Sequence, residues 1–189
     1  MAELRTLGKV VEVDVLVVGH GCAGLAVAIT AKETDPSLKV LAVDKGSVGY
    51  SGKANKGGGH CAFIPEGGEE TYVEYHTRRL GDYLNDQDLL RKYANSTRDV
   101  LADVERWGAK VYGKEAPFNA HPMIPWKVTT VDLDFMLGHA KFAQSLGVEF
   151  MDKVAVVDLL MDGGKIVGAI GFSLLDGKTF VFKAKAVVL

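Results

Sequence analysis

The N-terminal part of the chain alternates short apolar runs with a glycine-rich break, and this pattern predicts a β-α-β unit. Val11 to Val18 is apolar and mostly β-branched, as expected of a strand that is buried on both faces. Glycines interrupt the pattern between residues 19 and 24. Leu25 to Lys32 then has the composition of a helix, and a second apolar run covers Lys39 to Val43. Strand, glycine turn, helix and strand within about 30 residues make one such unit.

The middle of the chain is less regular, and it predicts a long loop followed by helices. Residues 45–68 are rich in glycine and have no hydrophobic period, and a loop of that length inside a domain is usually functional or disordered. Helical spacing resumes at Glu69–Leu80 and at Asp88–Trp107, where Gly108 is placed to end the second helix. After a stretch punctuated by prolines, a further helix is predicted from Asp132 to Ser145.

The last forty residues predict a three-stranded antiparallel meander. Strand-like runs at Val154–Met161, Ile166–Leu174 and Thr179–Leu189 are separated by Asp-Gly-Gly-Lys and Asp-Gly-Lys, which are hairpin-turn signals. The final run stays apolar up to Leu189, so we expect the chain to be cut in mid-strand. The predicted fold class is α/β, a Rossmann-like nucleotide-binding domain truncated at its C-terminus, with residues 1–189 as its first segment.

Composition and charge narrow the class of protein. Hydrophobic residues make up 48% and charged residues 24% of the 189, which is the usual balance of a globular protein with a buried core. The net charge of −2, without blocks of like charge, argues against a nucleic-acid surface. No stretch reaches the ~18 apolar residues of a membrane span. Two cysteines are too few for a disulfide framework, so we expect a reduced, cytoplasmic setting.

The glycine break carries the chemistry. Gly19, Gly21 and Gly24 form a G-x-G-x-x-G fingerprint between a predicted strand and a predicted helix. Gly19 permits the tight turn, Gly21 lets the backbone approach a pyrophosphate, and Gly24 lets the helix pack on the strand. Asp44 follows Gly24 by twenty residues, at the end of the second strand, where it can accept from a ribose hydroxyl. The pattern predicts dinucleotide binding, and the fingerprint alone does not distinguish NAD from FAD.

The second glycine-rich loop and the meander together resemble one family, the flavoprotein subunits of fumarate reductase and succinate dehydrogenase. In that family a fingerprint, an acid, a Ser-Gly or Ser-His pair, a Gly-Gly loop, helices and a meander follow in this order. The resemblance covers Asp14 to Leu189, and segments such as Glu105-Arg-Trp-Gly and Gly168-Ala-Ile-Gly-Phe-Ser are similar to the adenylylsulfate reductase flavoprotein subunit. Its most specific parts are residues 13–24, 43–59 and 179–189.

The resemblance implies FAD as the cofactor and assigns contacts along its length. The fingerprint would line the pyrophosphate, an acid and its two neighbours would hold the adenosine ribose, and a Ser-Gly pair would contact phosphate and ribityl groups. Two further glycines would lie flat against the flavin ring, because a Cβ there would occupy the space of the ring. The implied contacts are Gly19, Gly21, Cys22, Ala23, Gly24, Asp44, Lys45, Gly46, Ser51, Gly52, Gly57, Gly58 and, through its backbone at the adenine, Val156.

Two departures from the family pattern bear on the chemistry. Succinate dehydrogenases carry a histidine after the serine and bond it to FAD; Gly52 stands there in this chain, so we expect FAD to be bound non-covalently. The family also has an asparagine just beyond its Gly-Gly pair, where this chain has His60, Cys61 and Ala62. That second departure weakens the case for adenylylsulfate reduction as the reaction.

His60 is a weak candidate for a proton donor near the ring, since imidazole titrates near neutral pH. The alternative is a polar loop residue that bonds to backbone, and Cys61 is more typical of a small buried group than of a redox thiol. We predict no metal site, because Cys22, His60 and Cys61 lack ligand spacing. The sequence shows no acid or base partner at useful spacing for the other histidines, which are His20, His76, His121 and His139.

Three functions remain open. The first is an FAD-dependent oxidoreductase that transfers two electrons between a small acid, such as fumarate, succinate or a related oxyanion, and a partner such as an iron–sulfur subunit. The second is a non-catalytic flavin-binding or electron-relay module of a larger complex. The third is an NAD-dependent dehydrogenase with a long loop. The resemblance places the substrate-binding residues beyond Leu189, so the catalytic residues are unknown and the 189 residues alone are expected to be inactive. Any association with a membrane would then be peripheral, through a partner subunit.

Overall fold

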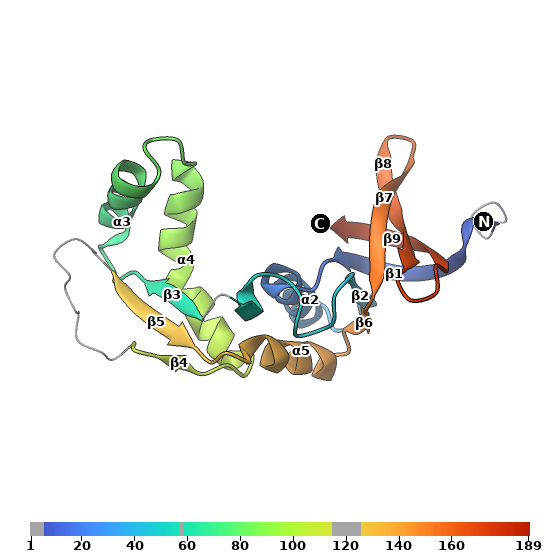
Figure 1. The fold of residues 1–189 in the computed structure, drawn as a ribbon, viewed down its shortest axis with the longest axis horizontal. Helices are drawn as coiled ribbons and strands as arrows, with labels where there is room; N and C mark the ends of the chain where they lie inside the picture. The colour runs from blue at the N-terminus through green and yellow to red at the C-terminus, as the bar shows by residue number, and fades with distance from the viewer. Residues whose placement is uncertain (1–5, 57–58, 115–125) are drawn as a thin grey trace. The chain divides into compact units, whose positions relative to one another are not determined.

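The structure is a computed structural model and describes residues 6–56, 59–114 and 126–189. The chain divides into two compact units, drawn in Figure 1. The first unit combines residues 1–56 with 136–189, and the second covers residues 57–135. Helices and strands mix in both units, so the predicted α/β class is confirmed.

The first unit is built on a six-stranded sheet in the order β6-β2-β1-β9-β8-β7. β1 lies parallel to β2 and to β9, and β2 lies parallel to β6. β8 runs antiparallel to both β7 and β9, so the predicted meander is present and continues the parallel sheet through β9. The strands are β1 (Lys9–Val18), β2 (Val40–Val43), β6 (Glu149–Met151), β7 (Val154–Asp162), β8 (Lys165–Ser173) and β9 (Thr179–Val188).

Helix α2 (Cys22–Thr34) connects β1 to β2 and completes the predicted β-α-β unit. Its buried residues include Leu25, Ala28 and Ile29, which recur at helical spacing. All four residues of β2 are buried, as expected of a parallel strand covered on both faces. Helix α5 (Phe135–Ser145) leads into β6 and ends before Gly147, whose φ of +86° suits a helix terminus.

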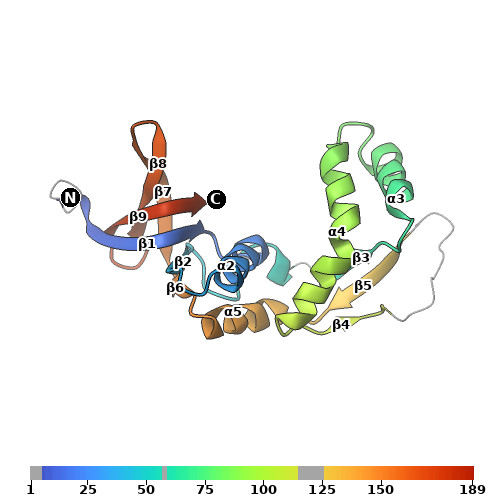
Figure 2. The same cartoon turned by 180° about the vertical axis from the view of Figure 1, so that it is seen from behind.

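The β7–β8 hairpin turns at two glycines with positive φ, Gly163 at +54° and Gly164 at +79°. Two consecutive positive φ values are the requirement of a type I′ turn, which the Asp-Gly-Gly-Lys sequence predicts. In both ribbon views, the hairpin projects away from the parallel strands (Figures 1 and 2). Beyond the hairpin's base, its outer residues are exposed, among them Val157 and Met161.

The second unit joins a small antiparallel sheet to a helical hairpin. The sheet has the order β3-β5-β4, with β3 at His60–Phe63, β5 at Lys127–Val131 and β4 at Val111–Tyr112. The helical part consists of α3 (Glu69–Tyr75), the π-helical segment η2 (His76–Leu80) and α4 (Gln87–Arg106). The carboxylate of Asp86 caps α4 by accepting from the backbone N–H groups of Asp88 and Leu89. Gly108 follows the helix with φ +96°, as predicted.

The structure corrects the prediction of an irregular segment over residues 45–68. A 3-10 turn, η1 (Ala54–Lys56), and strand β3 lie within it. The sequence does not predict β3, because its four residues do not alternate in polarity. Its partner β5 also lies far along the chain, as the pairing of Cys61 with Thr129 shows. Strands β4, β5 and β6 were also not predicted, and α5 begins at Phe135 and not at Asp132. The last turn of the predicted helix over residues 69–80 is η2.

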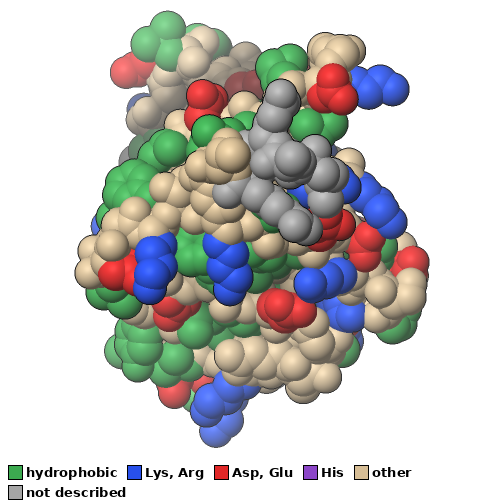
Figure 3. All heavy atoms as spheres, turned by 90° about the vertical axis from the view of Figure 1, so that its right-hand side faces the viewer, with side chains coloured by type: hydrophobic (Ala, Val, Ile, Leu, Met, Phe, Trp, Pro, Cys, Tyr) green, Lys and Arg blue, Asp and Glu red, His purple; other side chains and the backbone are tan. Residues whose placement is uncertain are grey.

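The surface is mixed in charge. On the face drawn in Figure 3, blue lysine and arginine side chains are interspersed with red acidic ones and with green apolar groups. Ion pairs between β1 and β9 show the same mixing: the ammonium of Lys185 lies 2.7 Å from Asp14 Oδ1, and that of Lys183 lies 3.6 Å from Glu12 Oε1. Among the described residues, each helix is too short or too polar to cross a membrane.

Candidate dinucleotide site

The turn between β1 and α2 has the geometry that its glycines predict. Gly19 has a φ of +95°, and its backbone N–H donates to the carbonyl of Val43 at 2.7 Å, which joins the turn to the end of β2. α2 begins at Cys22 with Gly21 as its N-cap residue. Glycine has no side chain with which to cap the helix. The first-turn N–H groups lack intrahelical acceptors, so the turn presents a favourable position for an anion.

Gly24 and Gly46 are needed for close packing around this turn. A Cβ at position 24 would overlap the carbonyl oxygen of Gly19, which is backbone and cannot rotate away. A Cβ at position 46 would overlap the hydroxyl oxygen of Ser51. Ser51 is buried, and its hydroxyl donates to the carbonyl of Ser47 at 3.2 Å. These contacts draw residues 44–52 into a tight loop beside the end of β2.

The two loops predicted to contact the phosphates lie against each other. A Cβ built on Gly52 would lie 3.2 Å from the Cα of Gly21, and one built on Gly21 would lie 3.6 Å from the Cα of Gly52. Gly52 has a φ of +78°, a conformation that strains any other residue. Glycine on both sides therefore lets the two backbones meet directly beside the start of α2. The sequence predicted each loop separately, and the structure brings them together.

Asp44 is fixed by main-chain donors at the end of β2. Its Oδ1 accepts from the N–H of Gly46 at 2.6 Å, and its Oδ2 accepts from the N–H of His20 at 2.9 Å. Burial raises the pKa of the Asp44 carboxyl, but these hydrogen bonds and the nearby His20 ring outweigh burial, and its pKa lies below the ordinary value. An ionised carboxylate has acceptors only, which suits a ribose hydroxyl.

The remaining predicted contacts fall in three places. Cys22, Ala23 and Lys45 are exposed beside the two loops. Val156 lies on β7 next to a β-bulge, two residues after Val154, whose N–H donates to the carbonyl of Asp44 at 3.0 Å. Gly57 and Gly58 lie outside the described residues.

The candidate proton donor His60 lies in the second unit. It is exposed on β3 and pairs with Thr130 of β5, so it belongs to a strand and not to a loop. Burial raises the pKa of the neighbouring Cys61 thiol, which keeps that group protonated and unreactive near neutral pH.

The structure corrects the sequence analysis at His20. The sequence shows no acid at useful spacing, but the ring is fully buried and its Nε2 lies 3.1 Å from Asp152 Oδ1, 132 residues further along the chain. Its Nδ1 lies 3.7 Å from Asp44 Oδ2. No local pattern could have revealed Asp152, because β2 and β6 become neighbours only in the folded sheet.

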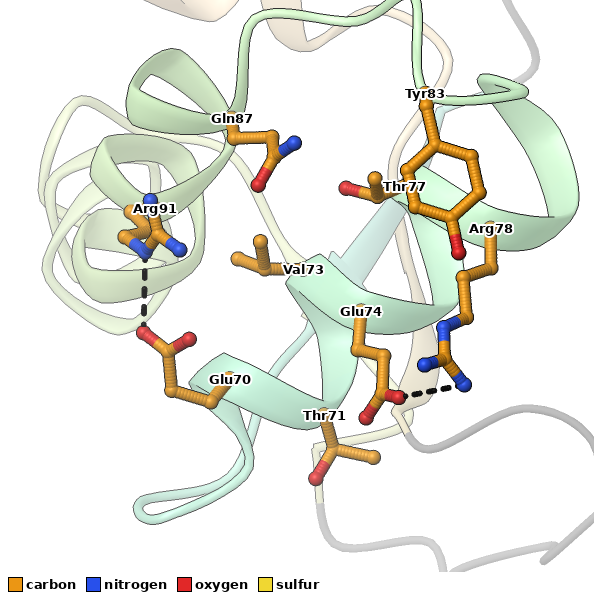
Figure 4. A pocket seen from close by; sticks show the side chains of 9 residues that line it. All are labelled: Glu70, Thr71, Val73, Glu74, Thr77, Arg78, Tyr83, Gln87 and Arg91. Carbon is orange, nitrogen blue, oxygen red and sulfur yellow. Dashed lines mark hydrogen bonds and ion pairs between the residues drawn. The ribbon is translucent and has the colours of Figure 1, made fainter.

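A separate cavity of about 390 Å³ lies in the second unit between α3, η2 and α4. Figure 4 shows ion pairs on two sides of it, Glu70 with Arg91 at 3.3 Å and Glu74 with Arg78 at 3.0 Å. Since each arginine is already paired with a carboxylate, the cavity presents little net charge to a ligand. The residues that line it are Glu70, Thr71, Val73, Glu74, Thr77, Arg78, Tyr83, Gln87 and Arg91, and they include no predicted site residue.

A parallel β-α-β unit with a glycine turn at the start of its helix and a carboxylate at the end of its second strand defines a dinucleotide-binding protein. The chain belongs to the FAD-binding domain family, whose model matches residues 14–189. The NAD-dependent reading is thereby set aside, and FAD is the cofactor of this fold.

Curated relatives and a solved structure agree with this assignment. The fumarate reductase flavoprotein subunit of Haemophilus influenzae is 28% identical over 192 residues, which cover 96% of this chain and 32% of that protein. The 8-methylmenaquinol:fumarate reductase flavoprotein subunit of Wolinella succinogenes is 27% identical over 187 residues, covering 93% and 30%. The adenylylsulfate reductase structure from Archaeoglobus fulgidus matches with a TM-score of 0.73 and 27% identity, over 95% of this chain and 30% of that one. The chain thus spans about a third of the length of these relatives. The resemblance to the fumarate reductase and succinate dehydrogenase flavoproteins is confirmed.

Proposed function

We propose that the protein is an FAD-dependent oxidoreductase of the fumarate reductase and succinate dehydrogenase type. Residues 1–189 are then the first segment of its FAD-binding domain. The protein transfers two electrons between a small acid substrate and an electron-transfer partner such as an iron–sulfur subunit. The bound flavin supplies the redox chemistry, and the residues of this chain supply binding and orientation.

The observation that carries the proposal is the approach of Gly21 to Gly52. The two loops meet without side chains beside the first turn of α2, and the N–H groups of that turn, which no side chain caps, suit a pyrophosphate. Asp44 stands at the end of β2 with its carboxylate oriented by two N–H donors, where it accepts from the adenosine ribose.

The remaining contacts follow the course of the two loops. Cys22, Ala23 and Gly24 bind the pyrophosphate through their backbone, and Lys45 and Gly46 lie beside the ribose. Ser51 and Gly52 contact the phosphate and ribityl groups. By the family resemblance, Gly57 and Gly58 are assigned to the flavin ring and the backbone of Val156 to the adenine.

Non-covalent binding follows from the residue at position 52. A glycine offers no atom for a bond to the flavin, and the φ of +78° there would strain a histidine. His60 is retained as the weak candidate for proton transfer, because it stands where the family carries an asparagine. No catalytic residue is otherwise assigned within the 189 residues.

Two observations favour a second candidate, an adenylylsulfate reductase-like subunit. The match to the Archaeoglobus fulgidus structure covers 95% of the chain at 27% identity. The segments around residues 105–108 and 168–173 also resemble that branch of the family. The imidazole and thiol of His60 and Cys61 in place of an amide oppose it, so fumarate or succinate is the preferred substrate class.

Purification and reoxidation of the intact natural protein test the proposal. The protein should be yellow, acid denaturation should release all of its flavin as free FAD, and the reduced flavin should be reoxidised by fumarate. Reoxidation by adenylylsulfate alone would support the second candidate. A yellow protein that neither compound reoxidises would indicate the flavin-binding or electron-relay module, and a colourless protein would overturn the proposal. Flavin that stays with the precipitate would contradict non-covalent binding.

A further inference from the structure

His20 is a buried polar side chain that the proposed FAD contacts do not use. Its ring has no solvent exposure and packs edge-on against Phe150 of β6, with ring centroids 5.7 Å apart. Packing alone does not require an imidazole at this position, since an apolar side chain of similar size would fill the volume. A buried nitrogen heterocycle indicates that its hydrogen bonds contribute to the structure.

The partner of the ring is the carboxylate of Asp152, in the turn between β6 and β7. The two oxygens of Asp152 also accept from the N–H of Val48, at 3.2 Å and 3.1 Å. A carboxylate that accepts from Val48 accepts from the imidazole as well, so His20 Nε2 is the donor in the 3.1 Å bond. Asp152 therefore holds the glycine turn through His20 and the 44–52 loop through Val48.

The same turn is joined to the 44–52 loop by backbone hydrogen bonds. The N–H of Lys153 donates to the carbonyl of Gly46 at 3.1 Å, and the N–H of Val154 donates to the carbonyl of Asp44 at 3.0 Å. The N–H of Asp44 in turn donates to the carbonyl of Met151 at 3.0 Å. The β6–β7 turn is thus bonded to both ends of the segment 44–46. The ring of His20 joins the glycine turn to the same β6–β7 turn through Asp152.

The other ring nitrogen faces the ribose-binding carboxylate. Among the described residues Nδ1 has no hydrogen-bond partner, and it lies 3.7 Å from Asp44 Oδ2. The backbone N–H of the same residue donates to that oxygen at 2.9 Å. One residue therefore orients Asp44 with its main chain and ties the glycine turn to Asp152 with its side chain. Loss of the ring's bond to Asp152 would free the turn that carries this N–H.

We propose that His20 is a positioning residue for FAD. Its Nε2–H···Asp152 hydrogen bond holds the Gly19–Gly24 turn and the Asp44 carboxylate in register for the pyrophosphate and the ribose. The ring acts through Asp152 and does not touch the cofactor. This inference rests on the proposed FAD site.

Two substitutions of His20 by amide residues, made in the intact protein, distinguish the role of Nε2 from that of Nδ1. The longer side chain in His20→Gln places its N–H near the position of Nε2 and still reaches Asp152, whereas the shorter one in His20→Asn matches Nδ1 and does not. FAD is removed, and the dissociation constant for added FAD is measured by flavin fluorescence, together with the thermal unfolding of each FAD-free variant. We expect His20→Gln to bind within about threefold of the wild type and His20→Asn at least about tenfold more weakly.

A substitution of Asp152 is the second test, and it decides the question even if a His20 variant fails to fold. Asp152→Ala should weaken FAD binding as much as His20→Asn, and the double variant should be no weaker than either single one. The exposed carboxylate of Asp176, in the turn between β8 and β9, provides the control, and Asp176→Ala should leave FAD binding unchanged.

The outcomes distinguish the two claims. Equal affinities for His20→Gln and His20→Asn, or wild-type affinity in Asp152→Ala, would overturn the positioning role while the FAD site stands. A wild-type protein that binds no FAD would overturn the proposed function and the positioning role together.

Discussion

The two units are each held together by different kinds of contact. In the first unit the predicted cofactor contacts are mostly glycines and backbone groups, placed by N–H···O bonds such as that from Gly19 to Val43. In the second unit a cluster of aromatic side chains packs together instead. Rings of Tyr72, His76 and Trp126 lie with their centroids 4.3–5.1 Å apart. A site made from backbone groups requires glycines, which can be recognised in the sequence. An aromatic cluster cannot be distinguished in the sequence from any other hydrophobic core.

The two units also differ in the direction in which the pKa values of their buried groups are shifted. In the first unit the Asp44 pKa is lowered, mainly because backbone N–H groups outweigh the opposing effect of burial. In the second unit burial raises the pKa of Tyr72, Tyr93 and Cys61. The candidate site therefore holds an ionised carboxylate, whereas the partly buried hydroxyl and thiol groups of the second unit keep their protons near neutral pH.

The largest expected effect is at Gly24. The substitution Gly24→Ala places a Cβ on the carbonyl oxygen of Gly19, and we expect a loss of about 3 kcal/mol in the free energy of unfolding, with FAD binding abolished. Gly177→Ala is the matched control in the same unit. Its φ is +70°, but no described atom lies within 4 Å of the new Cβ, so a loss of about 1 kcal/mol is expected. Urea unfolding of the FAD-free proteins measures both, and equal losses would contradict the packing at Gly24.

A smaller effect is expected from Tyr72→Phe in the second unit. Because the pKa of the buried Tyr72 is raised in the folded protein, the folded state keeps its proton where the unfolded state has lost it. The contribution to stability is complete below the unfolded pKa of about 10 and is lost as pH rises above it. Tyr72→Phe should therefore flatten the decline in stability between about pH 9 and 11.

The stability of Tyr72→Phe at neutral pH is the reference for its decline at alkaline pH. Removal of the Tyr72 hydroxyl ends its hydrogen bond with Tyr93 and should lower stability by about 1 kcal/mol. An unchanged alkaline slope in urea unfolding of Tyr72→Phe would show that the hydroxyl is not buried as described.

The smallest effect is expected in the alkylation rates of the two cysteines, one in each unit. Cys22 is exposed at the start of α2, and Cys61 is half-buried with a raised pKa. Iodoacetamide near neutral pH should alkylate Cys22 first, and added FAD should protect Cys22 without changing the rate at Cys61. Peptide mapping by mass spectrometry follows both rates. Equal protection of the two cysteines, or none at Cys22, would place the cofactor elsewhere.

Local signals account for the parts of the fold that the sequence predicts. β1, α2 and β2 follow from apolar runs and the fingerprint, and the β7–β8 hairpin follows from Asp-Gly-Gly-Lys. β3 and β5 were missed because their pairing joins distant segments and neither strand alternates clearly. In the candidate site the glycines and Asp44 could be predicted from spacing. The bond of His20 to Asp152 could not, because it depends on the order of strands in the sheet.

We expect FAD to bind where the loops of Gly21 and Gly52 meet. The substitution Gly21→Ala probes this place, because the new Cβ makes only ordinary contact, 3.6 Å from the Cα of Gly52, and should leave folding intact. Titration of the FAD-free intact protein with FAD should give a dissociation constant at least about tenfold larger for Gly21→Ala, at an unchanged unfolding temperature. Wild-type affinity in a folded Gly21→Ala protein would contradict the account.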